Sequence, residues 1–160
     1  MIRVGQGFDV HAFGPGDHVI LGGVRIPFRK GLQAHSDGDV LLHTVMDALL
    51  GAAGQRDIGH HFPPSEVAWK DADSRRLLRQ VGGSLAASGW QLVNLDATII
   101  CQAPKVAPHR EVMVANIARD LEADPEQVNI KATTTEGLGF AGRGEGIACQ
   151  AVVLIQRNDS

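Results

Sequence analysis

Acidic and imidazole side chains recur at short spacings in the first third of the chain, and both types are ligands for divalent metal ions. Asp9 and His11 stand two residues apart in a segment of alternating polarity, where a β-strand would direct both side chains to one face. Asp39, His43 and Asp47 stand four residues apart in a segment with helical apolar spacing, so a helix would align them in one stripe. A carboxylate together with imidazoles suits zinc.

Simpler interpretations exist for both groups. A hydrogen-bonded Asp–His pair without metal would account for Asp9 and His11, and a solvated face would account for the stripe on the helix. However, residues 37–53 contain no Lys, Arg or Glu, and a buried charge needs a partner. We therefore expect one metal site formed by Asp9, His11 and His43, with a fourth position open as in catalytic zinc sites.

Hydroxyl groups at two places could bind phosphate. His35 and Ser36 stand at the expected start of the helix that carries His43, where free amides favour an anion, although a serine there is often only a helix cap. Residues 131–136 (Lys-Ala-Thr-Thr-Thr-Glu) could present a row of hydroxyls to phosphate and ribose oxygens, with Glu136 holding Mg²⁺. A β-branched strand end is the plainer interpretation of that run.

Two loops could add binding groups. Residues 103–105 (Ala-Pro-Lys) follow an expected strand, a place where binding residues are often located. Residues 137–146 are rich in glycine and carry Phe140 and Arg143, which is compatible with close backbone approach to a ligand or with mobility.

Composition excludes several classes of protein. The chain has 160 residues, 15 Lys and Arg against 18 Asp and Glu, and 4% aromatic residues, so neither a basic footprint nor a stacking platform for nucleic acid is present. No apolar run reaches the roughly 18 residues of a membrane span, and no leader pattern opens the chain. Cys101 and Cys149 form no CxxC motif, which fits a reducing cytoplasm. We expect a cytoplasmic protein without nucleic-acid or membrane partners.

The positions of strands and helices follow from periodicity. We expect strands at 2–11, 19–21, 24–26, 92–101, 128–134 and 147–155, and helices at 34–54, 73–88 and 110–123. In the first strand, Ile2, Val4, Phe8 and Val10 would form the core face, opposite a bare face with Gly5, Gly7, Asp9 and His11. Together these elements predict one α+β domain over residues 1–160, an α/β sandwich with one mixed β-sheet and helices packed on one face.

These stretches together resemble the 2-C-methyl-D-erythritol 2,4-cyclodiphosphate synthase family. The resemblance is carried by residues 5–11 (Gly-Gln-Gly-Phe-Asp-Val-His), 35–40 (His-Ser-Asp-Gly-Asp-Val), His43, 57–59 (Asp-Ile-Gly), 72–74 (Ala-Asp-Ser), 103–105, 131–136 and 142–146 (Gly-Arg-Gly-Glu-Gly). It extends in order over nearly the whole chain. Pro64 departs from the family pattern, which often has an acidic residue after Phe-Pro, and His60-His61 depart as well.

The resemblance implies a phosphorus–oxygen lyase of the methylerythritol phosphate route to isoprenoids. Members of that family convert 4-diphosphocytidyl-2-C-methyl-D-erythritol 2-phosphate into the cyclic diphosphate and release CMP. They are homotrimers with active sites between subunits. By motif, zinc would be held by Asp9, His11 and His43, and Mg²⁺ or Mn²⁺ on the diphosphate by Glu136. His35 and Thr134 would stabilise the transition state. The substrate would contact Asp9, His11, His35, Ser36, Asp57, Ile58, Gly59, Phe62, Ala103, Pro104, Lys105, Thr133, Thr134, Thr135, Glu136, Phe140 and Arg143.

Two other functions fit the same residues. A generic metal-dependent phosphohydrolase would use water as the nucleophile, and a nucleotide-binding module would hold its metal for structure alone. The open fourth position next to a helix N-terminus favours the cyclase, because a structural zinc does not need an open position.

Overall fold

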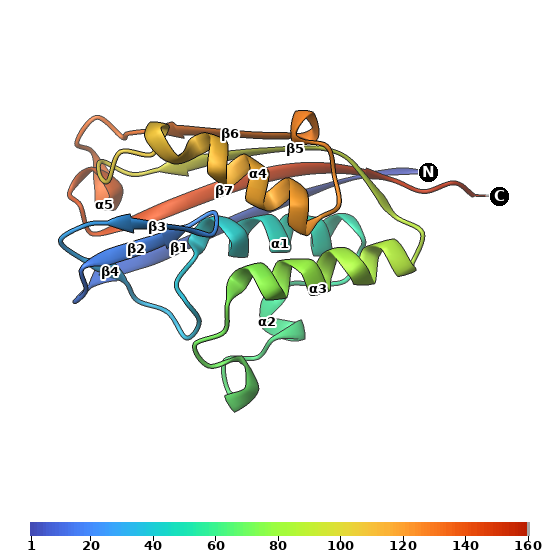
Figure 1. Ribbon diagram of the computed structural model, residues 1–160, viewed down its shortest axis with the longest axis horizontal. Helices are drawn as coiled ribbons and strands as arrows, with labels where there is room; N and C mark the ends of the chain where they lie inside the picture. Colours follow the sequence, from blue (N-terminus) through green and yellow to red (C-terminus); the bar gives the residue numbers. More distant parts are fainter. Residues whose placement is uncertain (160) are drawn as a thin grey trace.

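The computed structural model describes residues 1–159, and a five-stranded sheet with the order β4-β1-β7-β5-β6 runs through it (Figure 1). Strands β5 and β6 are parallel, and the other neighbouring strands are antiparallel. The sheet strands are β1 (Ile2–Gly14), β4 (Gly31–Leu32), β5 (Gln91–Ile100), β6 (Val128–Thr133) and β7 (Gly146–Gln156). A separate hairpin of β2 (His18–Leu21) and β3 (Val24–Pro27) turns at Gly22 and Gly23, between the two strands predicted at 19–21 and 24–26.

The helices cover one face of the sheet, so the predicted α+β fold is confirmed. They are α1 (Val40–Ala52), α2 (Ile58–His61), α3 (Ser74–Ala87), α4 (Arg110–Asp120) and α5 (Gly139–Gly142), and short 3₁₀ turns lie at Val67–Trp69, Ala107–His109 and Pro125–Gln127. Helix α1 lies against the sheet, and α3 packs on its other side (Figure 1). None of the helices in residues 1–159 combines the length and the hydropathy that a membrane span requires.

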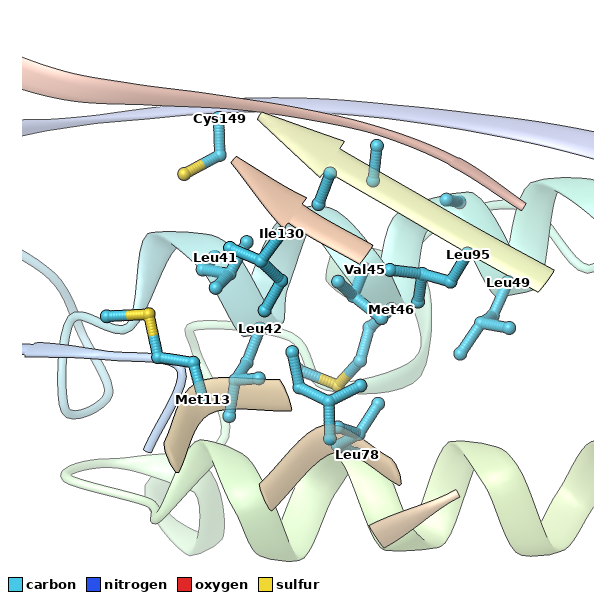
Figure 2. Close-up of a cluster of buried hydrophobic side chains, with 14 of the residues drawn as sticks. Leu41, Leu42, Val45, Met46, Leu49, Leu78, Leu95, Met113, Ile130 and Cys149 are labelled. Atoms are coloured by element: carbon cyan, nitrogen blue, oxygen red, sulfur yellow. The ribbon is translucent and has the colours of Figure 1, made fainter. Parts of the chain in front are cut away.

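Helix α1 is apolar on nearly all sides because it lies between the sheet and two other helices. Figure 2 shows Leu42 and Met46 of α1 among Ile130 of β6, Leu78 of α3 and Met113 of α4. All five of these side chains are fully buried. Nearly every residue of α1 is therefore buried.

The start of α1 differs from the prediction of a helix from residue 34 with Ser36 as its cap. The helix begins at Val40, and the carboxylate of Asp39 caps it by accepting from Leu42 N at 3.0 Å. Gly38 has a left-handed φ of +82°, which interrupts a helix at that point. The preceding residues instead pair with the segment before α3, through Asp37 N to Ala72 O and Asp71 N to His35 O.

The assignment of faces on β1 was wrong. Gly5 and Gly7 face α1, and a Cβ at Gly7 would lie 2.1 Å from the carbonyl oxygen of Thr44, so only glycine lets the helix backbone approach this closely. The opposite face, with Val4 and Phe8, is exposed together with Val152 of β7. The alternating pattern marked two faces correctly, but the smaller residues were on the buried one.

Candidate metal site and adjoining pocket

Asp9, His11 and His43 come together where β1 passes α1, as the sequence predicted. The candidate ligand atoms of the three side chains all lie within 4.8 Å of one another. Asp9 Oδ2 is 3.1 Å from His11 Nε2 and 3.6 Å from His43 Nδ1, and the two imidazole rings meet edge to face at 5.0 Å. The close contact of β1 with α1 at Gly5 and Gly7 brings His43 to the strand.

Each imidazole is also held from its other nitrogen. His11 Nδ1 donates to the carbonyl oxygen of Gly38 at 2.9 Å, which leaves Nε2 facing Asp9. His43 Nε2 lies 3.0 Å from the hydroxyl oxygens of both Ser36 and Ser74, which leaves Nδ1 facing Asp9. One carboxylate oxygen and two imidazole nitrogens thus converge, and this donor set fits zinc with a fourth position open.

The charges at the site favour a cation. Burial alone would raise the pKa of Asp9, but the neighbouring imidazoles of His11 and His43 outweigh it and hold that pKa well below its usual range. Burial opposes a charge on His11, yet the neighbouring carboxylate of Asp9 and the carbonyl of Gly38 leave the pKa of His11 raised. Asp9 is therefore ionised at neutral pH and provides a fixed negative charge.

A pocket of about 240 Å³ adjoins the three side chains. One wall is polar and includes His35 and Ser36, and another is apolar, where the rings of Phe62 and Trp69 pack edge to face at 4.9 Å. Its lining residues are His11, Gln33, Ala34, His35, Ser36, His43, Ile58, Gly59, Phe62, Pro64, Trp69 and Leu77. The pocket can take a small molecule with an anionic end near Ser36 and an apolar part near Phe62.

A larger cavity of about 430 Å³ lies at the opposite end of the strands, between Trp90 and Leu121. Glu122 is the one ionisable side chain in its lining. The pocket beside Asp9, His11 and His43 is therefore the candidate site, because ionisable and metal-binding groups converge on it.

The remaining acidic residues of the α1 stripe act elsewhere. Asp39 is fully buried and accepts from the backbone N–H groups of Gly22 and Gly23 at 3.0 and 2.7 Å, which holds the hairpin to the start of α1. Asp47 accepts from Ile58 N at 2.9 Å and so positions the segment that begins at Asp57. Asp57 itself caps α2 through His60 N at 2.9 Å.

A second group of predicted residues gathers at the β6 edge of the sheet. Cys101 N donates to Thr133 O at 3.0 Å, and Thr135 N donates to the side chain of Gln102 at 3.1 Å. These bonds place residues 103–105 (Ala-Pro-Lys) beside the Thr133 to Glu136 run. Glu136 N in turn donates to Thr134 Oγ1 at 3.2 Å.

The two groups are separated across the sheet. Strand registers place Asp9 opposite Cys149, Cys149 opposite Ile99, and Ile99 opposite Ala132. Asp9 on β1 and Ala132 on β6 are thus three strand spacings of about 4.8 Å apart, which separates their backbones by roughly 14 Å. Within one chain, the candidate metal site and the threonine edge are therefore distinct regions.

Phe140 and Arg143 lie at α5, in the loop that joins β6 to β7. Phe140 is exposed, and Arg143 Nε donates to Glu145 Oε2 at 2.8 Å. The loop approaches β1, since Phe13 N donates to Glu145 O at 2.9 Å.

Sequence reasoning missed several residues around the site. Trp69 and Leu77 line the pocket, and Asp37 and Ser74 connect to His43 through hydrogen bonds. The spacing of these residues in the sequence gives no sign that they meet. The helix predicted over residues 73–88 did match α3, which is the element that carries Ser74.

Known proteins are similar to this chain over nearly its whole length. A family model described as the YgbB family matches residues 2–156. A 2-C-methyl-D-erythritol 2,4-cyclodiphosphate synthase of Xylella fastidiosa is 60% identical over 98% of this chain and 89% of its own length. The structure of the bifunctional IspDF from Campylobacter jejuni matches with a TM-score of 0.95 and 45% identity, over 99% of this chain and 43% of that protein. A CDP complex of IspF from Plasmodium falciparum matches with a TM-score of 0.86 and 34% identity, over 99% and 97%.

Proposed function

The chain belongs to the YgbB family and has the activity of a 2-C-methyl-D-erythritol 2,4-cyclodiphosphate synthase, and we propose that it forms the cyclic diphosphate at a site shared between copies of the chain. It is a phosphorus–oxygen lyase of the methylerythritol phosphate route to isoprenoids. The observation that carries the proposed mechanism is the convergence of Asp9, His11 and His43 beside the pocket that contains Ser36.

In the proposed reaction, the 2-phosphate of 4-diphosphocytidyl-2-C-methyl-D-erythritol 2-phosphate attacks the phosphorus next to the methylerythritol. A new P–O bond closes the ring, and the P–O bond to the cytidine phosphate breaks, so CMP leaves. Because the nucleophile belongs to the substrate, the chain needs only to align two anionic groups and stabilise the charge that develops. We assign transition-state stabilisation to His35 and Thr134.

We propose zinc as the ion bound by Asp9 Oδ2, His11 Nε2 and His43 Nδ1, and Mg²⁺ or Mn²⁺ at Glu136. When bound, these ions polarise the phosphoryl oxygens and neutralise the leaving phosphate. Ser36 Oγ accepts from Gly38 N at 3.4 Å and lies 3.0 Å from His43 Nε2. Its hydroxyl proton can therefore be donated to a phosphate oxygen next to the metal site.

The remaining substrate contacts follow the two regions of the fold. We assign the methylerythritol part to Asp57, Ile58, Gly59 and Phe62, since Ile58, Gly59 and Phe62 line the pocket. The cytidine and diphosphate would bind at the β6 edge, and the CDP complex of the Plasmodium falciparum relative supports a cytidine nucleotide as ligand. The contacts there are Ala103, Pro104, Lys105, Thr133, Thr134, Thr135 and Glu136, with Phe140 and Arg143 nearby in the loop.

We propose a homotrimer in which one copy supplies the metal site and its neighbour the cytidine edge. Two features support it: the two regions lie roughly 14 Å apart in one chain, and the sheet face away from the helices exposes apolar side chains. Ile2, Val4, Phe8 and Val10 of β1 and Val152 of β7 form this exposed face. An uncovered apolar face of this kind is typical of an interface.

The activity test is incubation with the cytidyl substrate and Mg²⁺. We expect CMP and the cyclic diphosphate from the wild type, and a loss of at least about 100-fold in Asp9→Asn because the anionic metal ligand is removed. Asp17→Asn is the matched control, since Asp17 contacts His18 at 2.7 Å but is highly exposed. CMP with a linear, hydrolysed product would instead identify a phosphohydrolase, and CMP binding without turnover a nucleotide-binding module.

The trimer is tested by native mass at one protomer concentration. Val152→Asp puts a charge on the apolar sheet face and should give monomers that lose activity. Val112→Asp is the control, because Val112 lies on α4 and is 53% exposed, close to the 49% of Val152. A trimeric Val152→Asp, or a monomeric wild type, would refute the shared site.

We further propose that residues 1–160 act as one catalytic domain in the cytoplasm. Apolar side chains from the sheet and from α1, α3 and α4 form one core cluster. Cys101 and Cys149 are both buried free thiols, as expected in a reducing compartment.

A further inference from the structure

A fully buried serine at the start of α3 contacts the candidate metal ligand that α1 supplies. Ser74 has no exposed surface, and its Oγ lies 3.0 Å from His43 Nε2. The same hydroxyl donates to Asp37 Oδ1 at 2.6 Å, while Ser74 N donates to Asp37 Oδ2 at 3.0 Å. Asp37 thus holds Ser74 through both its backbone and its side chain.

These contacts fix the direction of each hydrogen bond. An ionised carboxylate can only accept, so the hydroxyl proton of Ser74 points to Asp37. The oxygen of Ser74 is then left as an acceptor towards His43, and His43 Nε2 must carry the proton. In a neutral imidazole the other nitrogen, Nδ1, is then unprotonated, and it faces Asp9 at 3.6 Å.

His11 is oriented in the same manner by a different group. The carbonyl oxygen of Gly38 accepts from its Nδ1, so in the neutral ring that a metal binds, Nε2 is the unprotonated nitrogen that faces Asp9. Partners of this kind fix the tautomer and orientation of metal-binding imidazoles in proteins generally. A backbone carbonyl fixes the tautomer and orientation of His11, and no side-chain substitution can remove that carbonyl. A side chain has this role for His43, so a substitution can test it.

We propose that Ser74, oriented by Asp37, is the positioning residue that holds His43 with its Nδ1 lone pair directed at the metal. This inference rests on the metal site of the proposed function. It also connects α3 to the site, because α3 begins at Ser74 and the segments 35–37 and 71–74 are joined by backbone hydrogen bonds. Ser36 also lies 3.0 Å from His43 Nε2, but no carboxylate in residues 1–159 accepts its hydroxyl proton as Asp37 accepts that of Ser74, so the proton of Ser36 stays available to a phosphate.

The first test is zinc affinity by competition with a chromophoric chelator. Ser74→Ala should weaken zinc binding by about 10- to 100-fold, the range typical of lost partners of metal ligands. Ser74→Thr retains the hydroxyl and should bind zinc nearly as the wild type does. Ser84→Ala is the matched control, since Ser84 is an exposed serine of the same helix, and its affinity should not change.

The second test is a spectrum that a purely structural role of Ser74 would not change. In the zinc-loaded chain with ¹⁵N-labelled histidine, His43 should show a protonated Nε2 whose proton exchanges slowly because it is hydrogen-bonded. That signal should be lost or exchange rapidly in Ser74→Ala and remain in Ser84→Ala. If Ser74→Ala does not fold, Ser74→Cys, which is close in size but a poor acceptor, takes its place.

The outcomes separate this inference from the metal site itself. A wild type that binds no zinc would refute the metal assignment of the proposed function. A wild type that binds zinc, with unchanged affinity and an unchanged His43 spectrum in Ser74→Ala, would refute the role of Ser74 alone.

Discussion

The contact of Gly7 with α1 makes a strong prediction about stability and metal binding together. In Gly7→Ala, the new Cβ would lie 2.1 Å from the carbonyl oxygen of Thr44 and 3.0 Å from Ala48 N, both of which are backbone atoms. Side-chain rotation cannot relieve such contacts, so the distance to Thr44 O must grow to at least 3.0 Å by separating β1 from α1. Overpacking of this type costs about 1–3 kcal/mol, and we expect the upper part of that range.

The same separation would open the candidate metal site. Asp9 and His11 belong to β1 and His43 to α1, and the 3.6 Å between Asp9 Oδ2 and His43 Nδ1 spans this interface. Zinc–ligand bonds are about 2.0–2.2 Å, so a shift near 1 Å displaces one ligand from a bonding position. We expect zinc affinity to fall by roughly 10- to 100-fold.

The assays are denaturant unfolding and zinc competition, both at one protomer concentration because assembly would affect stability. Gly83→Ala is the matched control: it lies in α3, and its Cβ would meet nothing within 4 Å. In a helix interior this change should stabilise the chain by about 0.5–1 kcal/mol. Two results would show that the close approach of β1 and α1 does not position the site. One is a free energy of unfolding of Gly7→Ala within about 0.5 kcal/mol of the wild-type value, and the other is an unchanged zinc affinity.

Three further perturbations test other contacts. Burial raises the pKa of Asp39 from 3.8 to about 6, so its stabilising contribution is present below the unfolded value and is lost as pH rises through 6. The difference in unfolding free energy between the wild type and Asp39→Asn should therefore fall by roughly 2–3 kcal/mol between pH 4 and pH 7. A difference independent of pH would contradict this. Asp120 is buried and lies 2.8 Å from Arg75 Nε, so Asp120→Asn should lower the free energy of unfolding by about 1–3 kcal/mol. The same change at Asp96, which is more exposed, should lower it by at most about 1 kcal/mol. Equal losses in the two variants would show that burial of the ion pair is not decisive. Chelation should lower the thermal midpoint of the wild type but not of Asp9→Asn, and an equal decrease in both would place the bound metal elsewhere.

Much of the site could be predicted because its chemistry depends on residue type and local spacing. The separation of two between Asp9 and His11 determines a shared face on any strand, whatever packs on it. The apolar residues next to His43 in the sequence similarly indicated a helix whose few polar groups need partners when they are buried. These conclusions use only the periodicities of strands and helices.

The errors arose where a local pattern had more than one tertiary solution. Alternation on β1 separates two faces but does not say which one packs on a helix, and the usual preference for large apolar residues in the core pointed to the wrong one. The start of α1 was placed six residues too early, because the pairing of Asp37 with Ala72 depends on a segment more than thirty residues away.

The sequence by itself therefore determined the class of fold, the metal-binding residue types and the resemblance to a family of cyclases. Only the tertiary structure decided that glycines bring α1 onto β1, that the candidate metal site and the threonine edge lie on separate strands, and that Ser74 and Asp37 hold His43. The physical reason is that residue types and short spacings specify local geometry, whereas hydrogen bonds between distant segments and the approach of two backbones depend on how the whole chain packs.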